Sequence, residues 1–356
     1  MDKARYAKRR EKLRVLMRAK GLDALLLTLD ANRFYVSGFE LQDHQVNESS
    51  GCVLVTANGT DWLCTDPRYD DAAKRLWDPS HIFIYGGDAA KSVNALVRDK
   101  VSGVVGFEES AMTVQFYKSF SEGLTLQPAD GLVEQLRMIK EPEEIARMQA
   151  SAALNHKLME WLPGTLCVGK TEEEIAWSVE QYFRQNGAES LAFPCITAVG
   201  ANAALPHAVP GKTAVTENSC VLVDVGCRLD DYCSDQTRTF WVGDKPTGVF
   251  METITLVRTA QERAIEAIRP GVAASAVYAV AREFLEAAGV ARNFTHGLGH
   301  GVGLQTHEGP SLNPRNETIL QPGMVVTVEP GLYYPEWGGV RWEYMVLVTE
   351  EGRRIL

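Results

Sequence analysis

The sequence predicts a mixed α/β (α+β) protein of two domains, and three observations support this fold class. The chain has 356 residues, which is long for a single hydrophobic core. Helix-like and strand-like segments alternate through its first third and include a hairpin signal, which predicts a domain with a mixed sheet. The remainder combines long helical segments with paired strands that carry acidic residues. We expect one domain over residues 1–130 and a second over residues 131–356.

Composition and charge are those of an ordinary globular protein. Hydrophobic residues make up 45% of the chain, charged residues 23%, and the formal net charge is −10. This acidic balance argues against nucleic acid as a partner. No run of about 18 apolar residues suggests a membrane span, and the first residues lack the apolar stretch of a secretory signal. The seven cysteines form no CxxC pair, so we expect reduced thiols in a cytoplasmic protein.

The elements of the first domain follow from apolar periodicity and turn residues. A helix is expected up to Lys20, where Gly21 ends it, and "DALLLTL" predicts a buried strand. "GCVLVTANGTDWLCT" predicts two strands joined around Asn58-Gly59, a strong hairpin signal. Further strands are expected in "HIFIYGG", "GVVGFEES" and "LTLQPA", with the helix "TVQFYKSFSEG" among them.

The second domain begins with a long helical segment, residues 131–162, that Pro142 is expected to interrupt or restart. The segment "KTEEEIAWSVEQYFRQNG" predicts a helix that opens with a capping box of Thr171 and Glu174 and ends at Gly187. Two more helices are expected in "FMETITLVRTAQERAIEAI" and "AASAVYAVAREFLEAAG". Strands account for most of the rest.

Three of the seven histidines lie within twelve residues of one another. The segment "HGLGHGVGLQTHEG" contains His296, His300 and His307, and glycine dominates the positions between them. Glycine allows tight backbone paths and a close approach of other groups. A histidine cluster by itself does not distinguish a metal site from a catalytic or structural one, so nearby acidic residues decide the interpretation.

The first acidic pair is predicted on one hairpin. "VLVDVGCRLDDYCSDQTRTFWV" predicts two antiparallel strands with a turn near residues 229–231. A turn centred between residues 229 and 230 would place Asp224 directly opposite Asp235, with their Cβ atoms about 5 Å apart. Like charges in that position repel and require a cation.

A second hairpin predicts a second acidic pair. "VVTVEPGLYYPEWGGVRWEYMVLV" contains two apolar runs around an expected tip at Gly338-Gly339. A constant index sum of 672 places Glu329 near Glu343. Four carboxylates in an apolar sheet need compensating charge, which two divalent cations would supply. Carboxylates with imidazole favour a first-row metal, and two ions about 3.5–4 Å apart would share and deprotonate a water for hydrolysis.

These segments together resemble a known family. "VDVGCRLDDYCSDQTRTF", "HGLGHGVGLQTHEG", "TVEPGLYY" and "GVRWE" are similar to the metal-site motifs of the M24 peptidases, the group of aminopeptidase P, prolidase and methionine aminopeptidase. The resemblance covers the chain from about residue 135 to its end. It implies a pita-bread catalytic domain with internal pseudo-twofold symmetry. The preceding part resembles the creatinase-like N-terminal domain of aminopeptidase P and prolidase.

The resemblance implies five metal ligands. Asp224 resembles the terminal aspartate ligand and Asp235 the bridging one. His300 resembles the single histidine ligand. Glu329 resembles the terminal glutamate and Glu343 the bridging one. We expect two divalent ions per chain, Mn²⁺ first, with Co²⁺, Zn²⁺ and Fe²⁺ as alternatives.

Catalytic and substrate-side residues follow from the same resemblance. His207 in "LPHAVPG" and His307 match histidines that hold the scissile carbonyl and the leaving group, and Glu329 would serve as general base. The substrate-binding residues are expected to be His296, Tyr333 and Arg341. A structural role for Arg341, tying hairpin to hairpin, stays open beside this one.

The expected activity is hydrolysis of the Xaa-Pro bond at the N-terminus of short peptides or dipeptides by a hydroxide that bridges the metals. The family motif usually has aspartate after the last glutamate, where this chain has Tyr344, and a residue smaller than Trp342; these departures bear on support of the site and substrate preference. Alternatives are a methionine aminopeptidase, a creatinase-like amidinohydrolase or C–S lyase, and a non-catalytic binding module. A homodimer is expected by analogy.

Overall fold

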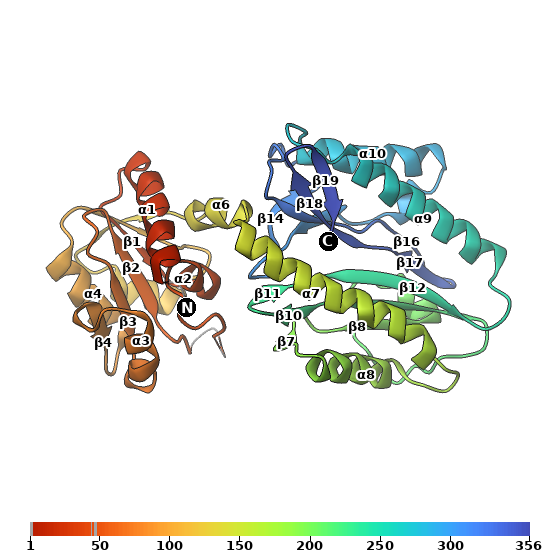
Figure 1. Cartoon of the computed structure of the whole chain (residues 1–356), viewed down its shortest axis with the longest axis horizontal. Helices are drawn as coiled ribbons and strands as arrows, with labels where there is room; N and C mark the ends of the chain where they lie inside the picture. Colours follow the sequence, from red (N-terminus) through yellow and green to blue (C-terminus); the bar gives the residue numbers. More distant parts are fainter. Residues whose placement is uncertain (1–2, 44, 46–47) are drawn as a thin grey trace. The chain divides into compact units, whose positions relative to one another are not determined.

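The computed structural model describes residues 3–43, 45 and 48–356. The chain divides into two compact units, Met1–Arg137 and Met138–Leu356. Among the described residues no helix is both long enough and apolar enough to cross a membrane. Figure 1 shows the elements of each unit, which are described separately below.

The first unit contains a six-stranded sheet in the order β4-β3-β2-β1-β5-β6. Its strands are β1 (Ala24–Leu27), β2 (Cys52–Thr56), β3 (Trp62–Thr65), β4 (Ile82–Ile84), β5 (Val104–Phe107) and β6 (Thr125–Pro128). Strands β1, β2 and β3 pair antiparallel, whereas β1 with β5, β3 with β4 and β5 with β6 pair parallel. The expected mixed sheet is confirmed.

Helices cover this sheet because its strand residues alternate between two buried faces. Ala24, Leu26 and Leu54 pack against α4 and α5 in one core. On the described part of the unit, α1 and α2 both contact β2 (Figure 1). The helices are α1 (Lys3–Ala19), α2 (Asp30–Ser37), α3 (Asp70–Leu76), α4 (Ala89–Lys100), α5 (Val114–Phe120) and α6 (Leu132–Met138). The hairpin at Gly59 is present, but five residues rather than two separate its strands.

The second unit repeats one arrangement, a pair of helices packed on strands. In its first half α7 (Pro142–Trp161) and α8 (Glu172–Gln185) share a core with β8, β9 and β10. Strands β8 (Ile196–Val199), β9 (Ser219–Val225) and β12 (Gln236–Val242) form one sheet in the order β12-β9-β8. Short strands β7 (Ser190–Leu191), β10 (Cys227–Leu229) and β11 (Tyr232–Cys233) form another.

In the second half, α9 (Gly248–Ala267) and α10 (Ala274–Ala287) pack on a five-stranded sheet in the order β14-β13-β15-β18-β19. The strands of this half are β13 (Gly299–Gly301), β14 (Glu308–Leu312), β15 (Val325–Val328), β16 (Gly331–Tyr334), β17 (Gly338–Arg341), β18 (Tyr344–Thr349) and β19 (Gly352–Ile355). Figure 1 shows α8 along one edge of this unit and α9 and α10 along the opposite edge, with α7 crossing between them. This repetition is the pseudo-twofold layout that the resemblance implied.

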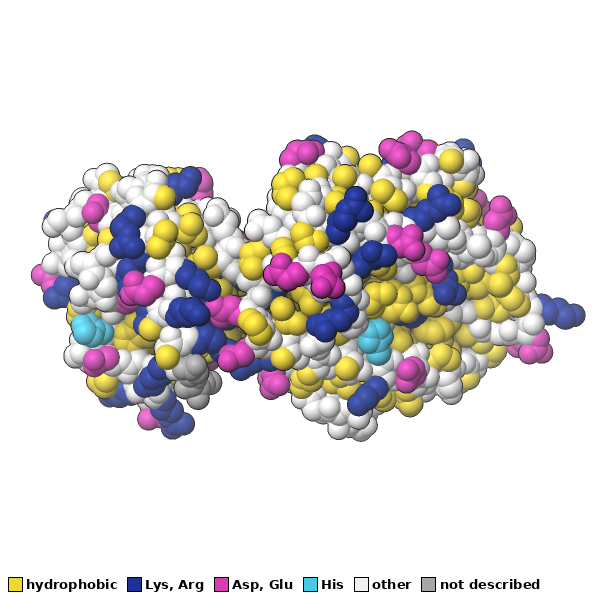
Figure 2. Space-filling view, turned by 45° about the horizontal axis from the view of Figure 1, so that its top comes forward, with side chains coloured by type: hydrophobic (Ala, Val, Ile, Leu, Met, Phe, Trp, Pro, Cys, Tyr) yellow, Lys and Arg dark blue, Asp and Glu magenta, His cyan; other side chains and the backbone are white. Residues whose placement is uncertain are grey.

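Local helix signals in this unit are confirmed. The helical segment over 131–162 breaks between α6 and α7, and Pro142 opens α7 at a first-turn position where no backbone N–H is needed. Thr171 caps α8, and Glu174 completes the capping box. The molecular face in Figure 2 shows acidic and basic side chains interspersed with apolar ones rather than one large block of basic residues.

The register of the first acidic hairpin differs from the prediction by two residues. Asp224 lies opposite Thr237, not opposite Asp235. The turn is centred one residue later than expected, because Asp230 and Asp231 both adopt positive φ values, 49° and 73°, and form its two central residues. A shift of two residues preserves the face of a strand, so Asp224 and Asp235 still point the same way.

The register of the second acidic hairpin matches the predicted index sum of 672. Val328 pairs with Tyr344 on one side of the acidic residues, and Gly331 pairs with Arg341 on the other. The tip was wrong, because residues 335–337 make the turn and Gly338 and Gly339 belong to β17. Glu329 lies between β15 and β16, and Glu343 lies between β17 and β18, so each falls at the equivalent break in one arm of the hairpin.

Candidate metal centre

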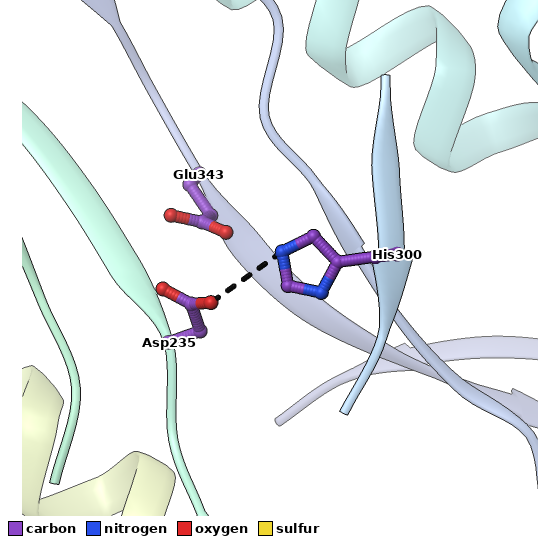
Figure 3. A group of neighbouring side chains, drawn as sticks. All are labelled: Asp235, His300 and Glu343. Carbon is purple, nitrogen blue, oxygen red and sulfur yellow. Dashed lines mark ion pairs between the residues drawn. The ribbon is translucent and has the colours of Figure 1, made fainter. Parts of the chain in front are cut away.

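Three side chains converge at the centre of the second unit. Asp235 precedes β12, His300 lies in β13, and Glu343 lies between β17 and β18. One ligand atom from each lies within 4.8 Å of the others. Figure 3 shows both carboxylates turned toward the imidazole of His300, whose Nε2 is 3.6 Å from Asp235 Oδ2. This group could hold a metal ion.

His300 is oriented by the backbone around it. Its Nδ1 lies 3.1 Å from the carbonyl oxygen of Gly301, so Nδ1–H donates there and Nε2 is left to face the carboxylates. Gly299 is needed next to it, because a Cβ at that position would lie 2.0 Å from the carbonyl oxygen of Thr327. Close packing of β13 on β15 therefore explains part of the glycine content of this segment.

Glu329 joins the group through His300. Its Oε1 is 3.3 Å from His300 Nε2, and its backbone N–H donates to the carbonyl of Leu298. Burial alone would raise the pKa of Glu329, but the hydrogen bond and charge of His300 outweigh it and lower the pKa to about 2. The same contact raises the pKa of His300 against the opposing effect of burial.

Asp224 is held by a buried chain of hydrogen bonds. Arg341 donates Nη2–H to Asp224 Oδ2 at 2.5 Å and Nη1–H to the hydroxyl oxygen of Tyr333 at 2.9 Å. The Tyr333 hydroxyl lies 2.9 Å from His296 Nε2, and His296 Nδ1 lies 2.6 Å from the carbonyl of Gly297. If His296 Nδ1–H donates to that carbonyl, Nε2 accepts from Tyr333 and both ring nitrogens are engaged.

Glu343 is held from the opposite hairpin. Thr237 donates its hydroxyl to Glu343 Oε2 at 2.7 Å, and the Glu343 N–H donates to the carbonyl of Thr237. The second oxygen, Glu343 Oε1, is buried and has no hydrogen-bond partner among the described residues, and the same holds for Asp224 Oδ1. Two buried carboxylate oxygens without a donor are costly unless a cation faces them.

The pKa shifts of these carboxylates also indicate that the group lacks compensating positive charge. Burial first, and then the neighbouring carboxylates, raise the pKa of Asp235 and Glu343 well above the usual range. Burial also raises the pKa of Asp224, against the effect of Arg341. Such shifts mean that the carboxylates resist ionising together in this pocket. A bound divalent cation would reverse the balance, and the residues therefore fit such an ion.

His307 lies beside the group at the end of a well-anchored loop. The residue as a whole is exposed, but its ring packs on that of His300 with 4.3 Å between centroids, and this partial burial lowers the pKa of His307. The loop is fixed by Glu308, whose Oε1 accepts from the Gln305 N–H and whose Oε2 lies 3.1 Å from Lys140 Nζ. His307 itself makes no side-chain hydrogen bond within the described residues.

His207 is the predicted residue least connected to this group. It is exposed and follows the 3₁₀ turn Gly200–Ala204. No hydrogen bond or ion pair joins it to the other site residues among those described. Burial is the largest cause that lowers the pKa of His296 and of His307, and His207 is close enough to both to contribute a smaller lowering effect.

Sequence reasoning missed several residues that support the site. Thr237 lies two positions after Asp235, so strand alternation could have placed it on the same face. Arg238 donates to the carbonyl of Glu343 from the first acidic hairpin. No local signal indicated the Lys140–Glu308 pair, whose partners are 168 positions apart.

Two known protein families match successive parts of the chain. Residues 146–350 match metallopeptidase family M24, and residues 9–139 match the creatinase/prolidase N-terminal domain. These matches confirm the fold class expected from the sequence, a creatinase-like domain followed by a pita-bread catalytic domain. The family also implies use of a divalent metal.

Individual relatives cover nearly the whole chain. A Xaa-Pro dipeptidase of Pyrococcus furiosus is 33% identical, over 98% of this chain and 97% of its own. The solved Xaa-Pro dipeptidase of Bacillus anthracis is 33% identical with a TM-score of 0.92, covering 98% and 97%. The X-Pro aminopeptidase structure of Thermotoga maritima is 32% identical with a TM-score of 0.82, covering 94% and 95%. The protein is a hydrolase and belongs to metallopeptidase family M24.

Proposed function

We propose that the protein hydrolyses Xaa-Pro bonds of dipeptides or short peptides with two divalent metal ions. The observation that carries the proposal is the buried carboxylate group around His300, with Asp224 Oδ1 and Glu343 Oε1 lacking any hydrogen-bond donor among the described residues. The relatives described above are named for Xaa-Pro cleavage, which favours this activity over methionine aminopeptidase.

The five proposed ligands share oxygen or imidazole donors of the kind that first-row divalent ions accept. They are Asp224, Asp235, His300, Glu329 and Glu343. Mn²⁺ is our first choice, with Co²⁺, Zn²⁺ and Fe²⁺ as alternatives. When bound, the ions supply Lewis acidity that lowers the pKa of water and polarises the scissile carbonyl.

The chain's own residues would move the protons. Glu329 is ionised at neutral pH and is proposed to accept the proton of the attacking water. Because its pKa is lowered below that of an ordinary imidazole, His307 is neutral at neutral pH and offers a ring N–H to the carbonyl as charge develops. His207 is proposed to assist departure of the prolyl nitrogen.

The substrate side is proposed to consist of His296, Tyr333 and Arg341. The ring of His296, which also packs against the rings of Phe294 and Tyr333, is proposed to help form an apolar surface for the ring of proline. Arg341 also holds Asp224, so the structural role left open for it is compatible with this one. A peptide bond to proline lacks an N–H, so a site that does not depend on that donor is chemically reasonable.

Turnover of three peptides tests the substrate class. Metal-loaded protein should cleave Ala-Pro and Ala-Pro-Ala faster than Met-Ala-Ser, whichever of Mn²⁺, Co²⁺ or Zn²⁺ is supplied. Good cleavage of Met-Ala-Ser with both prolyl peptides intact would reject the Xaa-Pro assignment. The relative rates of Ala-Pro and Ala-Pro-Ala decide between dipeptidase and aminopeptidase.

Assembly and cellular placement belong to the same proposal. We propose a homodimer that acts on short proline-containing peptides in the cytoplasm, without nucleic acid or membrane as partner. Light scattering at several protein concentrations tests the dimer directly. A mass of one chain at every concentration would reject it.

A further inference from the structure

Arg238 is a buried cation that forms no ion pair with a carboxylate among the described residues, although the charge of nearby Glu343 favours its charged form. Arg238 is 6% exposed. Removing a guanidinium from water is costly unless other groups stabilise its charge. Burial lowers the pKa of Arg238 to about 10, so it remains charged at neutral pH.

Two kinds of group stabilise that charge. Arg238 Nη1–H donates to the carbonyl of Thr237 at 2.8 Å and to the carbonyl of Glu343 at 2.6 Å. The guanidinium carbon also lies 4.4 Å from the ring centroid of Trp342 and 4.2 Å from that of Tyr344. Both distances are within cation–π range, and these interactions strengthen when the cation is desolvated.

The carbonyls that Arg238 contacts lie on different hairpins. Thr237 is on β12, two residues after Asp235, whereas Glu343 follows β17 on the second hairpin. The chain at Trp342 and Glu343 is outside regular strand structure, so its carbonyls depend on side-chain donors. Gln261 Nε2 supplies one to Trp342, and Arg238 supplies one to Glu343.

We propose that Arg238, held between Trp342 and Tyr344, is a positioning residue that fixes the spacing between Asp235 and Glu343 and so sets the affinity of the site for metal. The inference rests on the proposed metal-binding function. It also accounts for the two departures from the family motif: Tyr344 stands where the motif has aspartate, and its ring and that of Trp342 pack on the Arg238 guanidinium in place of a carboxylate.

The metal affinity of the full chain tests the proposed role of Arg238 without reference to peptide cleavage. Metal-free protein is titrated with Mn²⁺ against a chromophoric chelator, and the visible absorption of Co²⁺-loaded protein reports the ligand geometry. Arg238→Met should weaken metal binding about tenfold or more, as loss of groups behind metal ligands typically does. It should also change the Co²⁺ spectrum.

Arg258→Met is the matched control. Arg258 also lies over Trp342, at 5.2 Å, but it makes no hydrogen bond to the Glu343 segment in the described part of the chain. Its metal affinity should stay within about twofold of the parent's, given that it lacks any such link. Equal losses in the Arg258 and Arg238 variants would overturn the proposal, as would parent-like affinity of Arg238→Met.

Substitutions at Tyr344 keep the test decisive if Arg238→Met does not fold. Tyr344→Leu removes one of the two aromatic rings that pack on Arg238 and keeps Arg238 itself, so the metal affinity should fall. Tyr344→Phe should retain more of the metal affinity because the ring remains. Equal metal affinity in the two Tyr344 variants would overturn the proposal that the Tyr344 ring holds Arg238 in place. Because the readout is metal binding, failure of the Xaa-Pro assay would leave this result interpretable.

Discussion

Lys140 and Glu308 form an ion pair inside the catalytic unit, with Nζ 3.1 Å from Oε2 and side chains only 1% and 5% exposed. Glu308 directly follows His307, and its other oxygen accepts from the backbone of Gln305. The pair therefore connects the start of α7 to the loop that carries a proposed catalytic histidine.

Lys140→Met should destabilise the protein and lower turnover. Removing one partner of a buried ion pair leaves the other charge uncompensated, at a cost of about 3–5 kcal/mol. Urea unfolding measures the loss of stability. The double variant Lys140→Met/Glu308→Gln should recover part of it, since no buried charge is left. A single variant as stable as the parent would refute the importance of the pair.

Gly299→Ala should disrupt the metal centre, whereas Gly297→Ala should be tolerated. A Cβ at Gly299 would lie 2.0 Å from a backbone carbonyl of β15, but the nearest atom to a Cβ at Gly297 is 3.3 Å away. Overpacking of this kind costs about 1–3 kcal/mol and would push His300 away from Glu329. Thermal unfolding and metal titration of both variants measure the difference. Equal behaviour would show that β13 is not fixed by this contact.

His300→Ala and His307→Ala should separate metal binding from catalysis. His300 Nε2 faces the carboxylates, while His307 packs beside it and makes no hydrogen bond to them within the described part of the chain. Loss of His300 should reduce both metal content and turnover. Loss of His307 should reduce turnover about 10²-fold or more while metal remains bound. Elemental analysis that finds the same ion loss in both variants would contradict this division.

Glu108 should make the stability of the first unit depend on pH. Its buried carboxylate accepts from Asn32 Nδ2 and from the backbone of Leu29, and burial raises its pKa from 4.5 to about 7. Between these values the unfolded chain has lost the proton while the folded chain retains it. Stability therefore falls as pH rises from 4.5 through about 7, by up to roughly 3 kcal/mol, and then levels off.

Glu108→Gln isolates this contribution. The variant keeps a side-chain acceptor but has no proton to lose, so its stability relative to the parent should rise between pH 5 and pH 8. Urea unfolding of both proteins across that range measures the difference. Parallel pH profiles would assign the dependence to other groups.

Much of the fold could be predicted because local signals agreed with tertiary structure. Pro142 and the Thr171–Glu174 capping box set helix starts that depend mainly on nearby residues. The acidic hairpins were harder, since register depends on backbone conformation at the turn. Left-handed Asp230 and Asp231 moved the first turn by one residue, yet the side-chain period of two kept Asp224 and Asp235 on one face.

The supports of the site that depend on distant segments could not be predicted from sequence. Arg238 is stabilised by rings and a carbonyl about 105 positions later, and neither contact leaves a local pattern. Lys140 and Glu308 show the same difficulty. Donor types in spaced motifs indicate a metal centre, whereas the groups that hold those donors depend on how distant segments pack.

The central claim is that the carboxylate and histidine group binds divalent metal for Xaa-Pro hydrolysis. Titrating metal-free protein with Mn²⁺ while following Ala-Pro hydrolysis tests it most directly. The account predicts no turnover without metal and a rise to a plateau near about two ions per chain. Undiminished turnover after metal removal, or full metal binding with Ala-Pro left intact under each of Mn²⁺, Co²⁺ and Zn²⁺, would contradict it.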